Sequence, residues 1–313
     1  MTEEGMTEEG MTENVNEHTQ GHLLGAADIR RIAADAGISP TKKFGQNFVI
    51  DPGTVRRIVR EAGVTADDHV LEVGPGLGSL TLAILETGAT MTAVEIDPPV
   101  AERLPKTIAA FMPDAVDRFR VVNRDALTVN PENLPDFKDD DSFTLVANLP
   151  YNVATPILLT LLERFDNLGT FLVMVQKEVA DRMQTGPGNK DYGALSLAVQ
   201  YYADPYIVAN VPPNCFMPRP KVGSAVIRLT CHQEKPVQVQ DEKLMFNIIR
   251  ASFNQRRKTL ANGLKNAATL DFTKEEVEAA IDALGKGASG RGETLTLEEF
   301  ARLSDLLSPY KKG

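Results

Sequence analysis

Residues 69–81 read HVLEVGPGLGSLT, and this stretch predicts a buried strand, a glycine-rich turn and the start of a helix. Glycine at such a turn lets the backbone bend tightly and approach a ligand closely. The dinucleotide fingerprint G-x-G-x-x-G is not met, because its sixth position, counted from Gly74, is Ser79. The stretch therefore predicts an open α/β sheet with a ligand at this turn, and it argues against a nicotinamide dehydrogenase.

Polar side chains follow the next strands of this expected sheet. Glu95 ends the strand 91–95, 21 residues after Gly74, a spacing that suits a carboxylate accepting hydrogen bonds from ribose hydroxyls. Asp125 follows the strand 119–123 and can accept a hydrogen bond from an adenine amino group. Since ligands bind outside the carboxyl ends of strands in open α/β sheets, we expect these groups to face one crevice.

The run Asn148-Leu149-Pro150-Tyr151 follows a further apolar strand, 143–147. The Asn148 side-chain carbonyl and the backbone carbonyl of Leu149 or Pro150 can both accept hydrogen bonds from one exocyclic amino group. The Tyr151 ring can stack on a base. This run predicts a site that holds a nucleobase by its amino group.

With these motifs the chain resembles class I S-adenosylmethionine-dependent methyltransferases and, more narrowly, the ribosomal RNA adenine dimethyltransferase family. The matching stretches stand in the family's order: 43–48, 72–78, 94–97, 124–126, 148–152 and 216–222. The resemblance is strongest to bacterial members that dimethylate two adjacent adenines near the 3′ end of small-subunit ribosomal RNA. It implies S-adenosylmethionine as cofactor and a pre-assembled small subunit as the partner.

The resemblance also implies roles for individual residues. The expected cofactor contacts are Asn47, the backbone of Val49, Gly74, Glu95, Asp125 and Asn148. On the target side, Asn148 with Leu149 or Pro150 would hold the amino group, and Tyr151 would stack on the base. Phe216, in a Pro-rich loop, would form the opposite wall.

Five strand-like runs alternate with helical stretches through Gln176, which predicts a parallel sheet with helices on both faces. Two later β runs, 198–211 and 224–230, are joined by a Pro-rich connection without a helix and are expected to pair antiparallel. The fold class is therefore α/β, a Rossmann-like seven-stranded methyltransferase sheet.

A small all-helical C-terminal domain is expected to follow a polar linker. Thr273 with Glu276, and Thr296 with Glu299, have the spacing of capping boxes at helix starts. The chain is expected to divide into a disordered acidic tail (1–24), the methyltransferase domain (25–232) and the helical domain (233–313).

The formal net charge is −10, and the first 20 residues contribute six Glu and no Lys or Arg, so the remainder carries −10 + 6 = −4. Such a balance argues against a protein that coats RNA generally, yet it allows a local basic patch. The densest basic cluster comprises Arg250, Arg256, Arg257 and Lys258, and helical spacing would place Arg250 and Arg257 on one face. Further basic residues flank the expected crevice: Lys42, Lys43, Arg219 and Lys221.

Several classes of protein are disfavoured by what the sequence lacks. The two cysteines and four histidines show no metal-ligand spacing, so no metal site is expected. No apolar run reaches about 18 residues, and the acidic N-terminus is unlike a signal peptide. We therefore expect a monomeric cytoplasmic protein without a membrane span.

Two alternatives remain open from the sequence. One is a relative that methylates an adenine of large-subunit ribosomal RNA and confers macrolide resistance. The other is a non-catalytic ribosome-assembly or transcription factor that keeps the fold. The complete set Gly74, Glu95, Asp125 and Asn148 speaks against the loss of catalysis.

Overall fold

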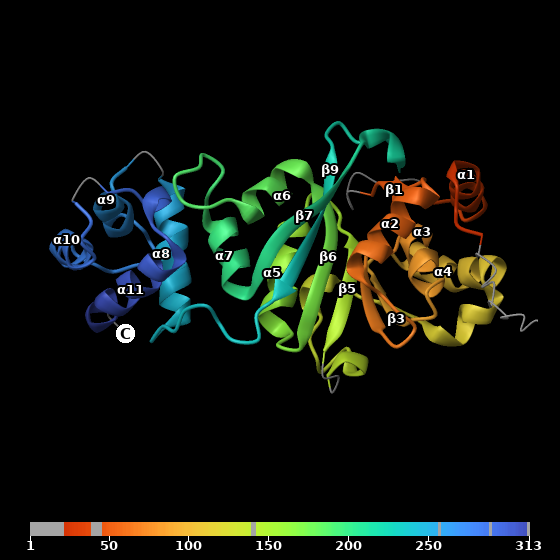
Figure 1. Cartoon of the computed structure of the whole chain (residues 1–313), viewed down its shortest axis with the longest axis horizontal. Coiled ribbons are helices and arrows are strands. Elements are labelled where there is room, and N and C mark those ends of the chain that lie inside the picture. Colours follow the sequence, from red (N-terminus) through yellow and green to blue (C-terminus); the bar gives the residue numbers. More distant parts are fainter. Residues whose placement is uncertain (1–21, 39–45, 139–141, 256–257, 288–289, 312–313) are drawn as a thin grey trace, which may run out of the picture.

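The structure is a computed structural model, and it describes residues 22–38, 46–138, 142–255, 258–287 and 290–311. A large sheet with helices on both faces forms the centre and one side of the molecule (Figure 1). A helical domain, blue in Figure 1, lies on the other side, next to α7 (Ala194–Tyr202). Among the described residues, no helix is both long and apolar enough to cross a membrane.

The main sheet has seven strands in the order β4-β3-β2-β5-β6-β9-β7. Their bounds are β2 (His69–Val73), β3 (Thr90–Glu95), β4 (Phe119–Asn123), β5 (Phe143–Asn148), β6 (Leu168–Gln176), β7 (Ala203–Val211) and β9 (Ser224–Cys231). The first five are parallel, and β9 pairs antiparallel with both β6 and β7. The predicted seven-stranded sheet, with its antiparallel late pair, is confirmed.

Successive strand residues point to opposite faces of the sheet, and each face has its own apolar core. One core is covered by α1 (Ala26–Asp35), α2 (Pro52–Ala62), α3 (Ser79–Leu85) and α4 (Pro98–Phe111). The other is covered by α5 (Ala154–Arg164), α6 (Lys177–Gln184) and α7. The 3-10 turns are Pro113–Arg118, Ala126–Thr128, Pro135–Phe137, Pro213–Cys215, Gly292–Thr294 and Ser308–Tyr310.

The predicted β run 198–211 is wrong in its first part, because Ala198 to Tyr202 form the end of α7. This helix is buried on two sides: Val199 packs on the sheet, while Leu197 and Tyr201 belong to the core of the helical domain. A helix that is apolar all round lacks the one-sided pattern that identifies a surface helix. Its sequence therefore resembles a buried strand.

The helical domain contains α8 (Glu242–Asn254), α9 (Leu260–Lys265), α10 (Lys274–Ala283) and α11 (Leu297–Leu307). Both predicted capping boxes form. The Thr273 N–H donates to Glu276 Oε2 at 2.8 Å, and the Thr296 N–H donates to Glu299 Oε2 at 3.1 Å. The domain shares its core with α7, so the two domains are joined by packing as well as by the linker.

The linker, which is the polar segment between the end of β9 and the start of α8, is fixed at the junction of the two domains. The Lys235 ammonium lies 3.9 Å from the centre of the Tyr202 ring, within reach of a cation–π interaction. The hydroxyls of Tyr201 and Tyr202 both donate to the carboxylate of Glu242, at 2.9 and 3.2 Å. These contacts link α7, the linker and the first helix of the helical domain.

The expected disordered tail 1–24 needs correction at its end. The side chains of Leu23 and Leu24 are only 5% and 1% exposed, because they belong to the hydrophobic core that α1 to α4 cover. His22 stacks on Phe111 with ring centres 5.6 Å apart. Residues 1–21 lie outside the described residues.

Candidate active site

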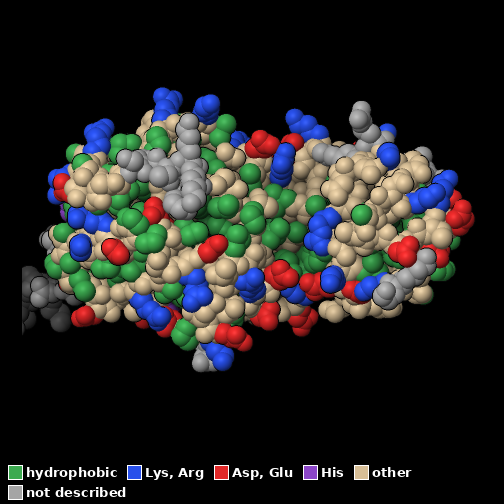
Figure 2. Space-filling model, turned by 180° about the vertical axis from the view of Figure 1, so that it is seen from behind, with side chains coloured by type: hydrophobic (Ala, Val, Ile, Leu, Met, Phe, Trp, Pro, Cys, Tyr) green, Lys and Arg blue, Asp and Glu red, His purple; other side chains and the backbone are tan. Residues whose placement is uncertain are grey.

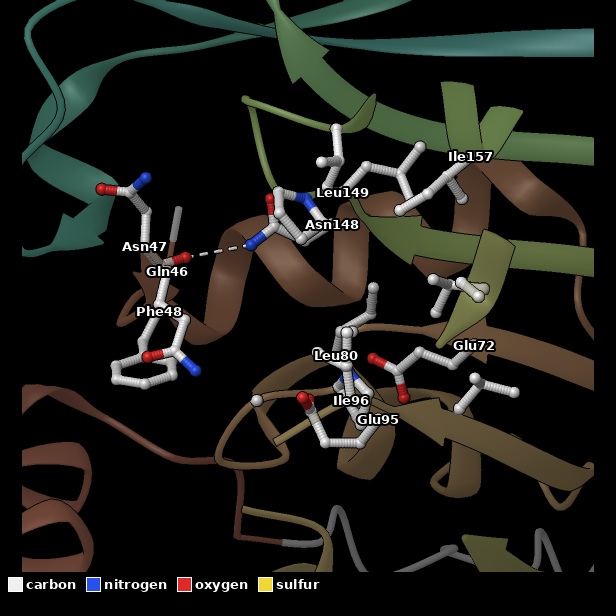
Figure 3. Close-up of a pocket in the computed structure, with 18 of the residues that line it drawn as sticks. Gln46, Asn47, Phe48, Glu72, Leu80, Glu95, Ile96, Asn148, Leu149 and Ile157 are labelled. Atoms are coloured by element: carbon white, nitrogen blue, oxygen red, sulfur yellow. Dashed lines mark hydrogen bonds between the residues drawn. The ribbon is translucent and has the colours of Figure 1, made fainter. Parts of the chain in front are cut away.

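A cavity of about 290 Å³ opens at the carboxyl ends of β2, β3 and β5 (Figure 3). The strand order reverses at β2, since β3 and β4 continue to one side and β5 and β6 to the other. Ligands in open α/β sheets bind at this kind of reversal. The structure brings together there all but one of the predicted site residues: Asn47, Val49, Gly74, Glu95, Asp125, Asn148, Leu149, Pro150 and Tyr151.

The glycine turn after β2 forms the floor of the cavity. Gly74 and Gly76 have φ angles of 69° and 56°, in the left-handed region that favours glycine. A Cβ on Gly76 would stand 3.0 Å from the ring of Phe48, so a side chain there would have to displace that ring. The Gly74 N–H donates to the Val94 carbonyl at 2.9 Å, which fixes the turn against β3.

Glu95 stands at the end of β3 and is 5% exposed. Burial raises the pKa of its carboxyl, while hydrogen bonds from backbone N–H groups, led by that of Asp97, act in the opposite direction. The Asp97 N–H donates to Glu95 Oε1 at 2.9 Å, which holds the carboxylate at the cavity wall. Ile96 follows it in the wall and is 45% exposed, so it offers an apolar surface beside the carboxylate.

Glu72 also lines the cavity, and our reading of the sequence assigned it no role. Burial raises the pKa of its carboxyl to about 8, the Thr81 hydroxyl opposes this shift, and the nearby Glu95 charge adds to it. The Thr81 hydroxyl donates to Glu72 Oε2 at 2.7 Å. An acidic residue inside an otherwise apolar strand was the signal that could have identified it.

Asp125 lies in the wall, after β4. Its Oδ1 accepts a hydrogen bond from the Leu127 N–H at 2.9 Å and so caps the short 3-10 turn Ala126–Thr128. Asp125 therefore both stabilises this turn and lines the cavity.

Asn148, the last residue of β5, is held by a segment distant in sequence. Its Nδ2 donates to the backbone carbonyl of Asn47 at 3.0 Å, the bond drawn dashed in Figure 3. This bond uses one of the two amide hydrogens and orients the side chain, so that the carbonyl oxygen is left to accept a hydrogen bond from a ligand. The next residue is also fixed, since the Leu149 N–H donates to the Met174 carbonyl of β6 at 3.1 Å.

Tyr151 completes the loop after β5. Its hydroxyl is hydrogen-bonded to the hydroxyl of Ser224, the first residue of β9. Burial raises the pKa of the Tyr151 hydroxyl, and the bond to Ser224 lowers it. Sequence reasoning missed Ser224, because no local pattern connects it to a residue 73 positions away.

The segment that carries Asn47 is fastened to the rest of the site by backbone contacts. β1 (Phe48–Val49) pairs antiparallel with β8 (Phe216–Met217). The Val49 carbonyl accepts a hydrogen bond from Ser79 Oγ at 2.7 Å, at the start of α3. The backbone of Val49 therefore has a structural partner, whatever its side chain.

Phe216 does not occupy the position that we expected from the sequence. Its side chain is 2% exposed and packs in the hydrophobic core, and it is not among the residues that line the cavity. The pairing of Val49 with Phe216 explains this, because it places Phe216 next to β1 inside the core. In this structure Phe216 supports the segment 46–50 and forms no wall.

Several basic side chains lie along the rim at which the parallel strands end. Figure 2 shows several Lys and Arg side chains along the upper rim, and further basic side chains interspersed with acidic ones over the lower half of this face. The upper rim is the end to which the arrows of the parallel strands, β6 among them, point in Figure 1. Arg219 and Lys221 are exposed in the loop just before β9.

The predicted basic cluster is only partly described. Arg250 is exposed on α8 and donates to Asn247 Oδ1 at 2.7 Å, and Lys258 is exposed beyond the helix. α8 ends at Asn254, and the predicted shared face of Arg250 and Arg257 stays a prediction because Arg257 is outside the described residues. Lys42, Lys43, Arg256 and Arg257 lie outside the described residues.

The sheet order, the glycine turn and the polar groups around the cavity are those of a Rossmann-like methyltransferase. A dimethyladenosine transferase from Plasmodium falciparum shares the fold, with a TM-score of 0.67 and 23% identity over 82% of this chain and 95% of that chain. The 23S rRNA methyltransferase ErmE is similar at a TM-score of 0.60 and 26% identity, over 84% of this chain and all of that chain.

Residues 39–299 match the family described as Ribosomal RNA adenine dimethylase. The chain is 70% identical to Ribosomal RNA small subunit methyltransferase A of Bifidobacterium adolescentis, over 94% of this chain and 97% of that protein. The protein of the same name from Streptomyces griseus is 49% identical over 90% of this chain and 94% of its own length. The chain belongs to the ribosomal RNA adenine dimethylase family.

Proposed function

We propose that the chain dimethylates N6 of two adjacent adenines near the 3′ end of small-subunit (16S) ribosomal RNA, using S-adenosylmethionine. The observation that carries the proposal is Asn148, whose amide is fixed by the Asn47 carbonyl in the wall of a cavity that Gly74, Glu95 and Asp125 also line. The names of the relatives that are 70% and 49% identical support the choice of the small subunit.

The residues of the cavity fit the cofactor. The turn with positive φ angles at Gly74 and Gly76 lets the backbone approach a ligand closely. Glu95 suits the ribose hydroxyls, and Asp125 suits the adenine amino group. When bound, S-adenosylmethionine supplies a methyl group activated by its sulfonium charge. We call Gly74, Glu95 and Asp125 the cofactor half of the cavity.

The loop Asn148–Tyr151 forms the target half. The lone pair of adenine N6 is delocalised into the ring, so the amine is a poor nucleophile. The Asn148 side-chain oxygen and the carbonyl of Leu149 or Pro150 would accept its two hydrogens and favour the geometry in which the lone pair localises. Positioning and fixed dipoles of this kind provide most of the rate enhancement.

Tyr151 would stack on the adenine, an interaction worth about 1–3 kcal/mol. The base has to leave its own stack to reach this site. No residue has to act as a general base, because the methylated ammonium loses its proton to water.

The proposed partner is the assembled small subunit. We propose that the protein binds it as a monomer, in the cytoplasm. The formal charge of −10 disfavours binding to RNA in general. Basic residues near the cavity, Arg219 and Lys221 among them, would hold the backbone of one structured target.

A second candidate is methylation of large-subunit ribosomal RNA, which the similarity to the 23S rRNA methyltransferase ErmE favours. That similarity rests on 26% identity, against 70% for the Bifidobacterium relative named for the small subunit. A non-catalytic assembly factor is the third candidate, and it would bind the cofactor without transferring its methyl group.

The test is to incubate the protein with labelled S-adenosylmethionine and small or large ribosomal subunits from cells that lack the modification. Label on adenines near the 3′ end of the small-subunit RNA is the expected result, and mass mapping counts the methyl groups on each. Label only on large subunits would select the second candidate. Cofactor binding with no label on either subunit would select the third.

A further inference from the structure

We propose that Ser224 is a positioning residue for the methyl transfer, because its hydroxyl holds the Tyr151 ring in the orientation in which the ring receives the target base. The hydrogen bond between the two hydroxyls joins β9 to the loop after β5. The inference rests on the function proposed above and extends the target half to a strand that contributes none of the cavity-lining residues.

Ser224 is held rigidly. It is 1% exposed and is the first residue of β9. Its backbone pairs with Gln176 of β6 on one side and Val211 of β7 on the other. The preceding residue is also fixed, since the Lys177 N–H donates to the Gly223 carbonyl at 3.0 Å. On such a backbone the short side chain can place its hydroxyl only at the few positions that its staggered rotamers allow.

Tyr151, in contrast, lies on a loop. The backbone of this loop is held through the Leu149 N–H and the Met174 carbonyl, at 3.1 Å, and through the amide of Asn148. Neither contact restrains the rotation of the Tyr151 ring about its own side-chain bonds. The bond to Ser224 does so, because it fixes the far end of the ring.

The orientation of the Tyr151 ring matters for methyl transfer, because Tyr151 lines the same cavity as Asn148. A base that stacks on a fixed ring presents its amino group at a fixed height and angle to the acceptors. A misplacement of reacting atoms by about 1 Å costs about 100-fold in rate. A phenyl ring without the hydroxyl would stack equally well but would rotate more freely.

The test compares Ser224→Ala, Tyr151→Phe and the double variant in a double-mutant cycle. Each single substitution removes one of the two hydroxyls that form the hydrogen bond, and both variants keep an aromatic ring at position 151. We expect kcat for small-subunit methylation to fall about fivefold to tenfold in each single variant, and no further in the double variant. The Kd for S-adenosylmethionine, measured by calorimetry, should stay within about twofold of wild type.

Ser252→Ala is the matched control, since Ser252 is also buried and its hydroxyl donates to the Ile248 carbonyl at 2.7 Å, in the helical domain. It should lower the melting temperature without lowering kcat. Wild-type kcat in Ser224→Ala would overturn the inference, and so would losses that add in the double variant. If wild-type protein itself transfers no methyl group, the proposed function has failed; if wild type is active and both single variants equal it, only the inference has failed.

Discussion

Gly74, Glu95 and Asp125 reach the cavity from the ends of three neighbouring parallel strands, whereas the loop Asn148–Tyr151 is held by segments far away in the chain. The amide of Asn148 bonds to a residue 101 positions earlier, and the hydroxyl of Tyr151 bonds to one 73 positions later. The cofactor half is thus built by local sequence and the target half by tertiary contacts. The two halves should respond differently to substitution.

The largest expected effect is in the target half. Asn148→Ala removes an acceptor for the amino group, and loss of one preorganised polar group in an active site costs about 100-fold to 1000-fold in kcat. We expect a loss of that size in methylation, with the melting temperature within a few degrees of wild type. Single-turnover kinetics with purified small subunits measures it.

Asn210→Ala, an exposed asparagine on β7, provides the control and should keep full activity. Turnover by Asn148→Ala close to that of wild type would remove this side chain from the mechanism. It would also end the distinction between the two halves, since the target half would then have no chemical role.

Glu95→Ala tests the cofactor half. The loss of a hydrogen bond to a charged group costs about 1–3 kcal/mol, so the Kd for S-adenosylmethionine should rise about fivefold to 150-fold. Calorimetry measures this directly. An exposed glutamate on α4, Glu102, supplies the control Glu102→Ala, which should bind as wild type does. Unchanged affinity in Glu95→Ala would place the ribose elsewhere.

The same contrast explains what could be predicted from the sequence. The glycine turn, Glu95 and Asp125 each follow a recognisable strand, and the carboxyl ends of parallel strands share one edge of a sheet. Their meeting at one cavity therefore required only the strand pattern. Glu72 escaped attention because its place inside an apolar strand suggests burial but does not say which side of the sheet it faces.

The features that sequence reasoning missed depend on contacts between distant segments. Phe216 was expected at the cavity, but pairing between β1 and β8, more than 160 positions apart in the chain, places it in the core. Ser224 gains its role only through Tyr151. The end of α7 was mistaken for a strand because the helical domain packs on its second face. None of these contacts has a local signature.

The pH dependence of stability should also distinguish the two halves, because the buried carboxyls of Glu72 and Glu95 line the cavity on the side of the cofactor half. The pKa of Glu72 is raised from 4.5 to about 8, mainly by burial, so the folded protein holds a proton that the unfolded chain releases. Its contribution to stability is complete below about pH 4.5 and is lost as pH rises toward 8. The expected slope is up to about 1.4 kcal/mol per pH unit.

Glu72→Gln keeps an acceptor for the Thr81 hydroxyl and removes the titration. Denaturant unfolding of both proteins from pH 5 to pH 9 should show the variant gaining relative to wild type up to about pH 8 and no further. Glu95, whose pKa is also raised by burial, is present in both proteins, so the difference between the two curves reports on Glu72 together with its interaction with Glu95. Parallel curves over the whole range would show that Glu72 is ionised in the folded protein.

The smallest expected effect concerns how RNA reaches the target half. If Arg250 and Lys258 contact phosphates, the variant Arg250→Gln with Lys258→Gln should bind small subunits with a weaker salt dependence. The slope of log K against log salt should fall by about 0.7–0.9 for each lost contact. Filter binding across a salt series measures this slope, on subunits rather than free RNA.

Affinity for S-adenosylmethionine should not change in this variant, because neither side chain lines the cavity. Lys243→Gln, near the start of α8 and outside the cluster, serves as the control and should leave the slope as it is. An unchanged slope in the double variant would assign Arg250 and Lys258 to an ordinary solvated surface. Docking would then rest on Arg219 and Lys221, in the loop that leads into Ser224, so that one short segment would both hold the RNA and position the ring that receives its base.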